Sequence, residues 1–280
     1  MSHVAATAGE DDRSVLSGSA LDLYHRLDRL FVQWAADYQA VDYLFPAFIP
    51  ACELAKLDYF RSFPHLVTFP VTLAPDEENL QRFVVGEPLS AAGDVQLTER
   101  AEIRHVLTPA ACYHVYIQLQ GASLTSAQYV TTRATCFRRE ARYAPFTRQW
   151  SFSMREIVCL GTAAEVSHFL AESRHTITRF LQRIGLPVAW KSATDPFFKP
   201  ASNPKYVMQK LDPVKTEMVF DDHLALGSVN FHRAYFGEVF HIMRHGQEIY
   251  SGCVAFGLER WVYAFLHHFG AHAADWPSFE

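Results

Sequence analysis

The chain has 280 residues, 49% of them hydrophobic and 20% charged, with a formal net charge of −5 at pH 7. This balance is typical of a soluble globular protein, and the negative charge does not favour a broad nucleic-acid-binding surface. Five scattered cysteines, no apolar run of membrane-spanning length and no signal peptide at the start argue against a disulfide framework and a membrane partner, so we expect a cytoplasmic protein.

Residues 1–17 are small and polar, and we expect them to be disordered, with residues 18–280 forming a single domain. An apolar stripe with three- and four-residue steps predicts a helix from about Ser19 to Tyr43. Its members are Tyr24, Leu27, Phe31, Trp34 and Tyr38. A shorter helix from about Cys52 to Tyr59 and a strand at Leu66–Thr72 are expected to follow.

The middle of the chain alternates between polar connections and short apolar runs. Residues 74–99 are rich in acidic and turn-forming residues and are expected to cross the surface as a connection. A strand is predicted at Tyr113–Gln120. Two further runs, residues 133–140 and 152–160, flank a loop that contains Pro145, and they predict two antiparallel strands joined by a long hairpin loop.

A helix is predicted from Thr162, a suitable N-cap, to Ile184, where Gly185 ends it. Five of the six lysines of the chain then fall between Lys191 and Lys215, so we interpret residues 162–215 as a helix and a basic loop inserted into the domain. The remaining predicted elements are strands at Lys215–Phe220, Ala225–Asn230, Gly237–Met243 and Ile249–Phe256 and a last helix at Leu258–Phe269. This order suits an α+β fold with a mainly antiparallel sheet flanked by helices.

The two strands around Pro145 bring charged residues onto one face. Side chains alternate along a strand, so Arg138 and Glu140 share a face, as do Phe152 and Glu156 on the partner strand. A buried face of this kind is costly unless a charged, flat ligand such as ATP satisfies it. A surface hairpin with ordinary ion pairs is the alternative.

Two segments carry a family resemblance. Phe137-Arg138-Arg139-Glu140, with the loop and strand that follow, resembles motif 2 of the class II aminoacyl-tRNA synthetases, and Gly257-Leu258-Glu259-Arg260 resembles motif 3. The helix, turn and proline-bearing strand before Thr72 are similar to motif 1, which forms the dimer interface in that family. The resemblance implies a class II synthetase-like catalytic domain that forms a homodimer.

The resemblance also implies roles toward ATP. Arg138 is expected to bind the α-phosphate, Glu140 to accept a hydrogen bond from the adenine amine, and Phe152 to stack on the base. Arg148 is expected to reach the distal phosphates, and Arg260 to cover the other adenine face and reach the γ-phosphate. Arg138 and Arg260 are the implied catalytic residues. Mg²⁺ is expected with ATP, although the acidic residue that usually holds it has no clear counterpart in this sequence.

Three residues match a zinc site in one branch of the family, the atypical zinc-dependent seryl-tRNA synthetases and the amino acid:[carrier protein] ligases. They are Cys112, Glu156 and Cys253, each expected on a different strand. Two thiolates and a carboxylate suit Zn²⁺ with a fourth position open for the substrate amino group. Cys136 competes with Cys112 as a ligand, whereas Cys52 and Cys159 are expected to be small core residues.

The resemblance therefore implies an amino acid:[carrier protein] ligase, which forms an aminoacyl-adenylate with ATP and passes the aminoacyl group to a phosphopantetheine thiol. Ala110 and Ala111, expected at the pocket entrance, favour glycine or alanine as the amino acid. Glu217 and Asn230 are candidate substrate contacts, with an exposed glutamate and a turn asparagine as the alternatives.

The acceptor is a separate question. The basic stretch from about Arg174 to Lys215 favours docking of an acidic carrier protein, although a lysine-rich loop is also common as plain soluble surface. Residues 18–44 supply one helix instead of the long hairpin that grips tRNA, so tRNA is not expected as a partner. The alternatives are a truncated zinc-type seryl-tRNA synthetase and a non-catalytic regulatory paralogue that keeps the fold.

Overall fold

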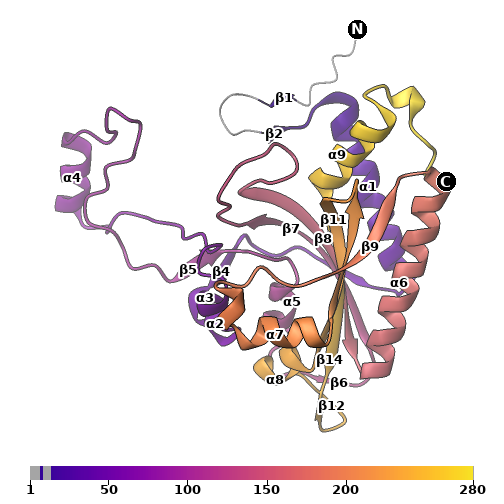
Figure 1. The fold of residues 1–280 in the computed structure, drawn as a ribbon. Helices are drawn as coiled ribbons and strands as arrows, with labels where there is room; N and C mark the ends of the chain where they lie inside the picture. The colour runs from indigo at the N-terminus through magenta and orange to yellow at the C-terminus, as the bar shows by residue number, and fades with distance from the viewer. Residues whose placement is uncertain (1–6, 9–13, 280) are drawn as a thin grey trace.

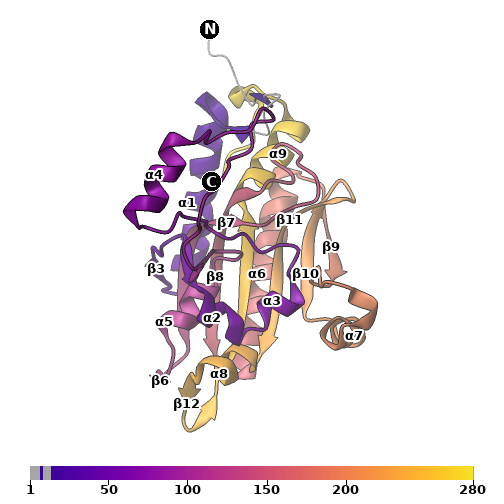
Figure 2. The same cartoon turned by 90° about the vertical axis from the view of Figure 1, so that its left-hand side faces the viewer.

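The computed structural model describes residues 7–8 and 14–279. Among these residues, seven strands form the main sheet, in the order β3-β7-β8-β14-β11-β10-β9 (Figure 2). They are β3 (Val41–Tyr43), β7 (Gln128–Phe137), β8 (Ser151–Gly161), β14 (Tyr250–Gly257), β11 (Leu224–Arg233), β10 (Lys215–Phe220) and β9 (Val188–Ala193). Neighbouring strands run antiparallel, apart from the parallel pair β3 and β7. The predicted α+β fold with a mainly antiparallel sheet is confirmed.

Three long helices cover one face of this sheet (Figure 1). They are α1 (Gly18–Ala36), α6 (Ala163–Ile184) and α9 (Leu258–Phe269). Their apolar faces bury the largest core cluster, in which Phe31 stacks on Phe256 with ring centroids 4.0 Å apart. The Thr162 side chain caps α6 in a capping box, and Gly185 ends it with a φ of 73°, so both predicted boundaries are confirmed.

Short helices and strands partly cover the opposite face. The helices are α2 (Ala51–Lys56), α3 (Tyr59–Ser62), α5 (Tyr113–Gln118), α7 (Pro204–Leu211) and α8 (Tyr235–Phe240), and the strands are β4 (Phe48–Pro50), β5 (His105–Leu107), β6 (Ser123–Leu124), β12 (Met243–Arg244) and β13 (Gln247–Glu248). A second core lies beneath them, where Tyr116 stacks on Phe236 with centroids 3.8 Å apart. Because this cover is incomplete, part of the sheet face stays open as a cleft.

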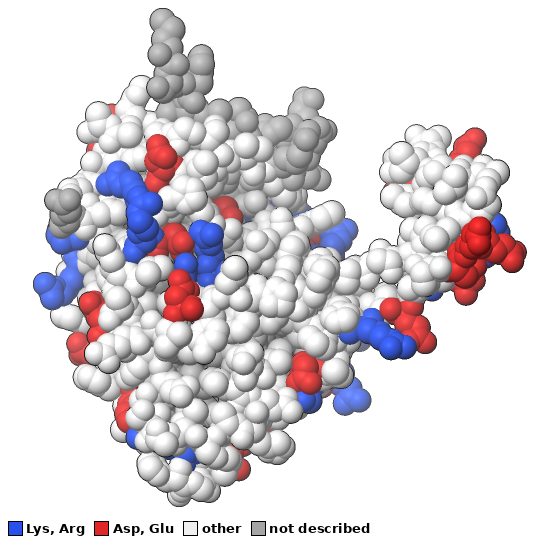
Figure 3. All heavy atoms as spheres, turned by 180° about the vertical axis from the view of Figure 1, so that it is seen from behind, with Lys and Arg blue, Asp and Glu red and all other residues white. Residues whose placement is uncertain are grey.

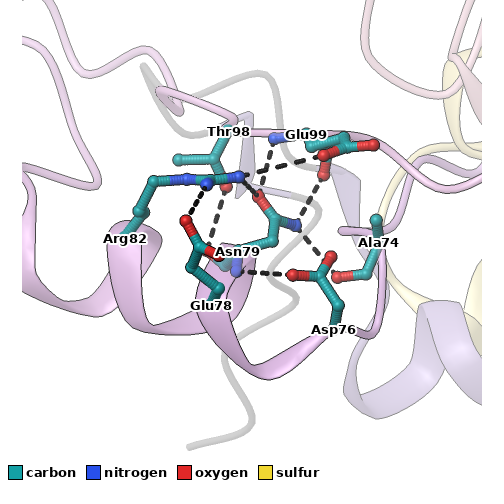
Figure 4. Close-up of polar contacts among 7 residues, drawn as sticks. All are labelled: Ala74, Asp76, Glu78, Asn79, Arg82, Thr98 and Glu99. Atoms are coloured by element: carbon teal, nitrogen blue, oxygen red, sulfur yellow. Dashed lines mark hydrogen bonds and ion pairs between the residues drawn. The ribbon is translucent and has the colours of Figure 1, made fainter.

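Residues 74–101, which we call the arm, stand out from the body of the molecule (Figures 1 and 2). The sequence predicted a surface connection here but not the helix α4 (Glu77–Val85). Asn79 is fully buried, and its side chain bonds the Ala74 carbonyl and both backbone groups of Glu99 (Figure 4). These hydrogen bonds join the start of α4 to the two chain segments at Ala74 and Glu99, and so stabilise a part of the chain that has little apolar core.

Three predicted strands are wrong. Tyr113–Gln120 instead forms α5, and Gly237–Met243 contributes to α8 and the short strand β12. In both segments the buried side chains pack as one turn of a helix, which a short apolar run does not distinguish from a strand. Leu66–Thr72 runs beside β5 with isolated backbone bonds, such as Leu107 N–H to Thr68 O. Pro70 lacks the donor that a regular ladder needs.

The other predicted elements differ from the structure mainly in where they begin and end. The helix predicted to end at Tyr43 ends at Ala36, because Gln39 turns the chain with a φ of 57° before β3 begins. The helix predicted at Cys52–Tyr59 divides into α2 and α3 at Asp58, whose φ is 55°.

Residues 1–17, predicted to be disordered, are described only in part. Within them β1 (Thr7–Ala8) pairs with β2 (Ser14–Val15), and residues 1–6 and 9–13 lie outside the described residues. None of the described helices has the length and apolar character to cross a bilayer.

Candidate active site

A cleft of about 640 Å³ opens on the partly covered face of the sheet. Its floor is built by side chains of β8, β14, β11 and β10. The strand register aligns one row across these four strands, in the order Glu156, Ala255, Ser228 and Glu217. Thr132 of β7 continues the row beside Glu156. Every site residue predicted from the sequence lines this cleft except Arg148, which contacts it through Glu140.

Two arginines face each other across the cleft, and main-chain carbonyls hold both. Arg138 follows the end of β7, donates from Nε to the Pro109 carbonyl at 2.9 Å, and lies 5.2 Å from the ring centroid of Phe152. Arg260 lies in the first turn of α9 and donates to the carbonyls of Thr147 and Ala225 at 2.8 and 2.9 Å. These neutral acceptors orient each guanidinium without cancelling its charge.

The third arginine adds to this positive field. Arg148 donates from Nη1 to Glu140 Oε2 at 2.6 Å. Burial, together with the charges of Arg138 and Arg148, lowers the pKa of Arg260 to about 10. The neighbouring like charges destabilise the Arg260 cation, so a bound polyanion beside it would be favoured.

Cys112, Glu156 and Cys253 form a buried cluster at the other end, with one ligand atom from each lying within 4.8 Å of the others. Glu156 Oε1 accepts from the backbone N–H groups of Ala111 and Cys112 at 3.0 and 3.2 Å. The neighbouring Cys253 thiol and burial raise the pKa of Cys112 well above its usual range. Two sulfurs and a carboxylate in a dry site suit a soft divalent cation such as Zn²⁺, so the donor set fits the expected metal.

The cluster differs from the expectation in one respect. Glu156 and Cys253 lie on adjacent strands, as predicted, but Cys112 belongs to the loop before α5 and not to a strand. Cys136, the competing ligand, is fully buried opposite Phe152 and packs against Ala111 and other apolar residues. Within the described residues it is not a member of the three-residue ligand group.

The remaining predicted residues lie between these two ends. Glu217 is paired with Lys215, with Oε1 and Nζ 3.2 Å apart. Asn230 donates from Nδ2 to Cys253 Sγ at 3.3 Å and to Ser228 Oγ at 2.9 Å. Both residues line the cleft.

Sequence reasoning missed several residues of the cleft. Asp195 lies in the connection between β9 and β10 and accepts from Lys215 Nζ at 3.2 Å. His232 follows Asn230 by two residues on β11, so the alternation of side chains along a strand is a signal that could have pointed to it. Burial lowers the pKa of His232 to about 4, although Asp195 raises it. Ala110 lines the cleft, whereas Ala111, expected beside it, is buried behind the wall.

A family model and two curated relatives match most of this chain. A family model described as the tRNA synthetase class II core domain (G, H, P, S and T) matches residues 96–269. Amino acid–[acyl-carrier-protein] ligase 1 of Bradyrhizobium diazoefficiens is 33% identical over 242 residues, which cover 84% of this chain and 73% of the relative. Ligase 2 of the same organism is 31% identical over 243 residues, with 83% and 71% covered.

More distant relatives share the fold. A type-2 serine–tRNA ligase of Methanococcus maripaludis is 24% identical over 276 residues, and the match spans about half of it, 53%. The M. kandleri SerRS, solved in complex with A. aeolicus tRNASec, superposes with a TM-score of 0.79 at 19% identity, covering 96% of this chain and 55% of the solved chain.

Proposed function

Because this chain belongs to the class II synthetase core family and, within it, to the amino acid–[acyl-carrier-protein] ligases, we propose that it activates glycine or alanine with ATP and transfers it to the phosphopantetheine thiol of a carrier protein. The observation that carries this proposal is one cleft that holds Arg138 and Arg260, with Arg148 bonded to its wall residue Glu140, at one end and a buried Cys-Glu-Cys cluster at the other. The first end suits a nucleotide and the second an amino acid.

Activation needs charge stabilisation more than a protein nucleophile. An oxygen of the amino-acid carboxylate attacks the α-phosphorus of ATP, the bond to the bridging oxygen breaks, and pyrophosphate leaves. Arg138 faces the phosphorus and Arg260 the distal phosphates, while Arg148 exchanges its Glu140 partner for phosphate oxygens. Glu140 is then free to accept from the adenine amine, and Phe152 stacks on the base. Mg²⁺ accompanies ATP in this fold.

We propose that Cys112, Glu156 and Cys253 hold Zn²⁺. When bound, the ion offers a free coordination position to the substrate amino group. The backbone donors of Ala111 and Cys112 keep one Glu156 oxygen fixed and so orient the carboxylate. Tyr113 and Phe236 belong to the same apolar cluster as both cysteines and line the cleft with them, which supports a substrate with a small side chain.

The transfer step uses the adenylate as the activated species. The phosphopantetheine sulfur attacks the adenylate carbonyl carbon, the bond to the phosphate oxygen breaks, AMP leaves, and the thiol proton passes to solvent. We propose that the acidic carrier docks on the basic surface from Arg174 to Lys215. This surface runs from α6 over the edge strand β9 to the start of β10. Arg174 lies 5.0 Å from the Trp190 ring centroid and links α6 to this edge. The arm shows acidic side chains instead (Figure 3), which disfavours it as a carrier contact.

We also propose that two chains form a homodimer through the segment similar to motif 1. β3 is the edge strand of the sheet, and beyond it Leu44 is 90% exposed. Phe48, Phe69 and Val71 are exposed apolar residues on the neighbouring segments. Such a patch is unusual on a monomer and supports an interface. Light scattering at two protein concentrations tests it.

Residues 18–280 are proposed to act as one catalytic domain. α6 and β9, predicted as part of an insertion, belong to the main core and the main sheet, so residues 194–214 are the part that leaves the sheet. A cytoplasmic location stays a prediction, to which the five free cysteines lend support.

ATP–pyrophosphate exchange with each amino acid, on protein of known metal content, tests the proposal. Exchange should be strongest with glycine or alanine, and serine is the competitor to test, because a small apolar pocket rejects an added hydroxyl only weakly. Cys112→Ala, Glu156→Ala and Cys253→Ala should lose zinc and exchange, and Cys136→Ala is the matched control. Loss of zinc in the control alone would show that the ligand set is wrong.

The same preparation separates the alternatives. A carrier protein with its phosphopantetheine arm should become aminoacylated, and total tRNA should not. Efficient charging of tRNA would favour a truncated zinc-type seryl-tRNA synthetase. Nucleotide binding without exchange for any amino acid would favour a regulatory paralogue.

A further inference from the structure

His232 connects three separate elements behind the Cys-Glu-Cys cluster. It lies on β11, with Nε2 3.6 Å from Cys253 Sγ on β14. Its other nitrogen, Nδ1, lies 3.0 Å from the Tyr116 hydroxyl on α5 and 3.4 Å from the Ser251 hydroxyl. The ring also meets Phe236 edge-on, with centroids 4.9 Å apart. Packing and polar contacts therefore set both the position and the plane of the imidazole.

With Cys253 as a thiolate, these contacts select one tautomer of the neutral ring. A neutral imidazole carries one N–H and one acceptor nitrogen. Both groups beside Nδ1 are hydroxyls, which can donate to it, whereas the group beside Nε2 is a sulfur, which as a thiolate can only accept. The consistent arrangement has the Tyr116 hydroxyl donating to Nδ1 and Nε2–H directed at Cys253 Sγ. Tyr116 is fully buried, so an unsatisfied hydroxyl there would be costly.

The sulfur of Cys253 thus meets two N–H donors, Nε2 of His232 and Nδ2 of Asn230. Cys112 Sγ differs, because its described side-chain contacts are with Cys253 and Glu156. Donors that face a sulfur stabilise its thiolate form and fix the direction of its lone pairs. The two cysteines of the cluster are therefore inequivalent before any ion binds.

We propose that His232, oriented by Tyr116, is a positioning residue that hydrogen-bonds the Cys253 thiolate and sets its geometry and donor strength toward a divalent metal. The inference rests on the proposed metal site and extends it outward by two residues. Outer hydrogen bonds of this kind typically change metal affinity by about 10–100-fold. The competing account is that His232 only fills space against Phe236 and satisfies Tyr116.

Cobalt-loaded protein provides a readout that does not depend on catalysis. A hydrogen bond lowers the energy of the sulfur electrons, so its loss should move the thiolate-to-cobalt charge-transfer band to lower energy. We expect this shift in His232→Phe, together with a loss of Co²⁺ affinity of roughly 10–100-fold in competition with a chromophoric chelator. His232→Gln restores an amide N–H and should recover most of both. Tyr116→Phe, which frees the ring to change tautomer, should be intermediate.

The controls separate this inference from the site beneath it. Tyr38→Phe removes a hydroxyl on the other face of the sheet, where it meets Ser173, and should leave band and affinity unchanged. Circular dichroism identifies any variant that does not fold. If His232→Phe does not fold, the band and affinity of His232→Gln and Tyr116→Phe test the inference in its place. A wild-type band and affinity in His232→Phe overturn the inference and leave the metal site standing. Wild-type protein without a cobalt–thiolate band overturns the metal site and this role with it.

Discussion

The arginines of the cleft share a local design. Arg138 is held by the Pro109 carbonyl and Arg260 by the carbonyls of Thr147 and Ala225, all at 2.8–2.9 Å. A carbonyl fixes the direction of a guanidinium but leaves its full charge for a ligand. Because these donors are already in place, little reorganisation is needed as negative charge develops on a phosphate.

Arg138→Ala and Arg260→Ala should each slow pyrophosphate exchange by about 10²–10³-fold, because each removes a preorganised donor to transition-state charge. Arg139→Ala is the control, since Arg139 lies 4.1 Å from the Trp150 ring centroid and does not line the cleft. Exchange near the wild-type rate in either variant would remove that arginine from the catalytic site. Loss of the folded state by circular dichroism would make its role structural.

At the scale of elements, the cleft strand β8 is anchored on its opposite face. Glu156 faces the cleft, and the residue before it, Arg155, points the other way and bonds an aspartate of the helix layer. Arg155 is 5% exposed and binds Asp28 of α1 and Asp42 of β3. A buried arginine that bridges a helix and an edge strand holds the sheet and the helix layer in one relative position, and the cleft depends on that position.

Asp28→Ala should lower the free energy of unfolding by about 3–5 kcal/mol, because it leaves the buried Arg155 without its main partner. Urea denaturation followed by circular dichroism measures this. Asp22→Ala, an exposed position on the same helix, should change stability by no more than about 0.5 kcal/mol. Equal small effects in both variants would contradict the anchoring role of Asp28.

We expect the local stability of the arm, residues 74–101, to depend strongly on Asn79. Asn79→Ala removes the three side-chain bonds to Ala74 and Glu99, at a local cost of about 1–3 kcal/mol, because each bond typically contributes about 0.5–1.5 kcal/mol. Amide hydrogen exchange should accelerate in residues 74–101 and stay unchanged in β8 and β14. Gln81→Ala, exposed on the same helix, is the control. Faster exchange throughout the sheet would show that the arm is not an independent unit.

At the scale of the whole molecule, the cleft and the basic surface meet at the β9 side of the sheet. α6 lies on one side of this strand and α7 on the other (Figure 1). Lys191 pairs with Asp222 at 2.9 Å and Lys215 with Asp195 at 3.2 Å, so part of the lysine charge is neutralised within the chain. The arginines of α6 thus contribute much of the field that an acidic partner would meet.

Combined charge reversal at Arg179, Arg183 and Lys191 should raise KM for the carrier protein, more strongly at low ionic strength, and leave pyrophosphate exchange intact. The matched control reverses Arg29, Arg100 and Arg104, which are exposed elsewhere and change the net charge equally. Steady-state kinetics at two salt concentrations measure the effect. Unchanged carrier kinetics, or an equal change in the control, would rule out this surface.

Much of the fold could be read from local pattern. The second strand of the Pro145 hairpin, the helix from Thr162 to Ile184 and the last helix appear where predicted. Each is long and strongly periodic or carries its own cap, so its conformation is decided by residues within it. The first strand, predicted at residues 133–140, is Gln128–Phe137, so Arg138 and Glu140 lie just beyond its end and not on it. α5 and α8 have six residues each. So short a segment does not show whether its apolar residues follow a helical or a strand period. The packing of α8 on β14 and of α5 on α8 determined that both are helices.

The candidate site divides in the same way. By itself the sequence determined which side chains share a strand face, because alternation is local: Glu156 with Phe152, and Asn230 with Ser228. Only the tertiary structure brought Cys112 to Glu156, 44 residues along the chain, and placed His232 against Cys253 and Tyr116. These residues come together because helices and loops pack onto the sheet. That packing depends on the sum of many weak contacts between distant parts of the chain, which a local sequence pattern does not reveal.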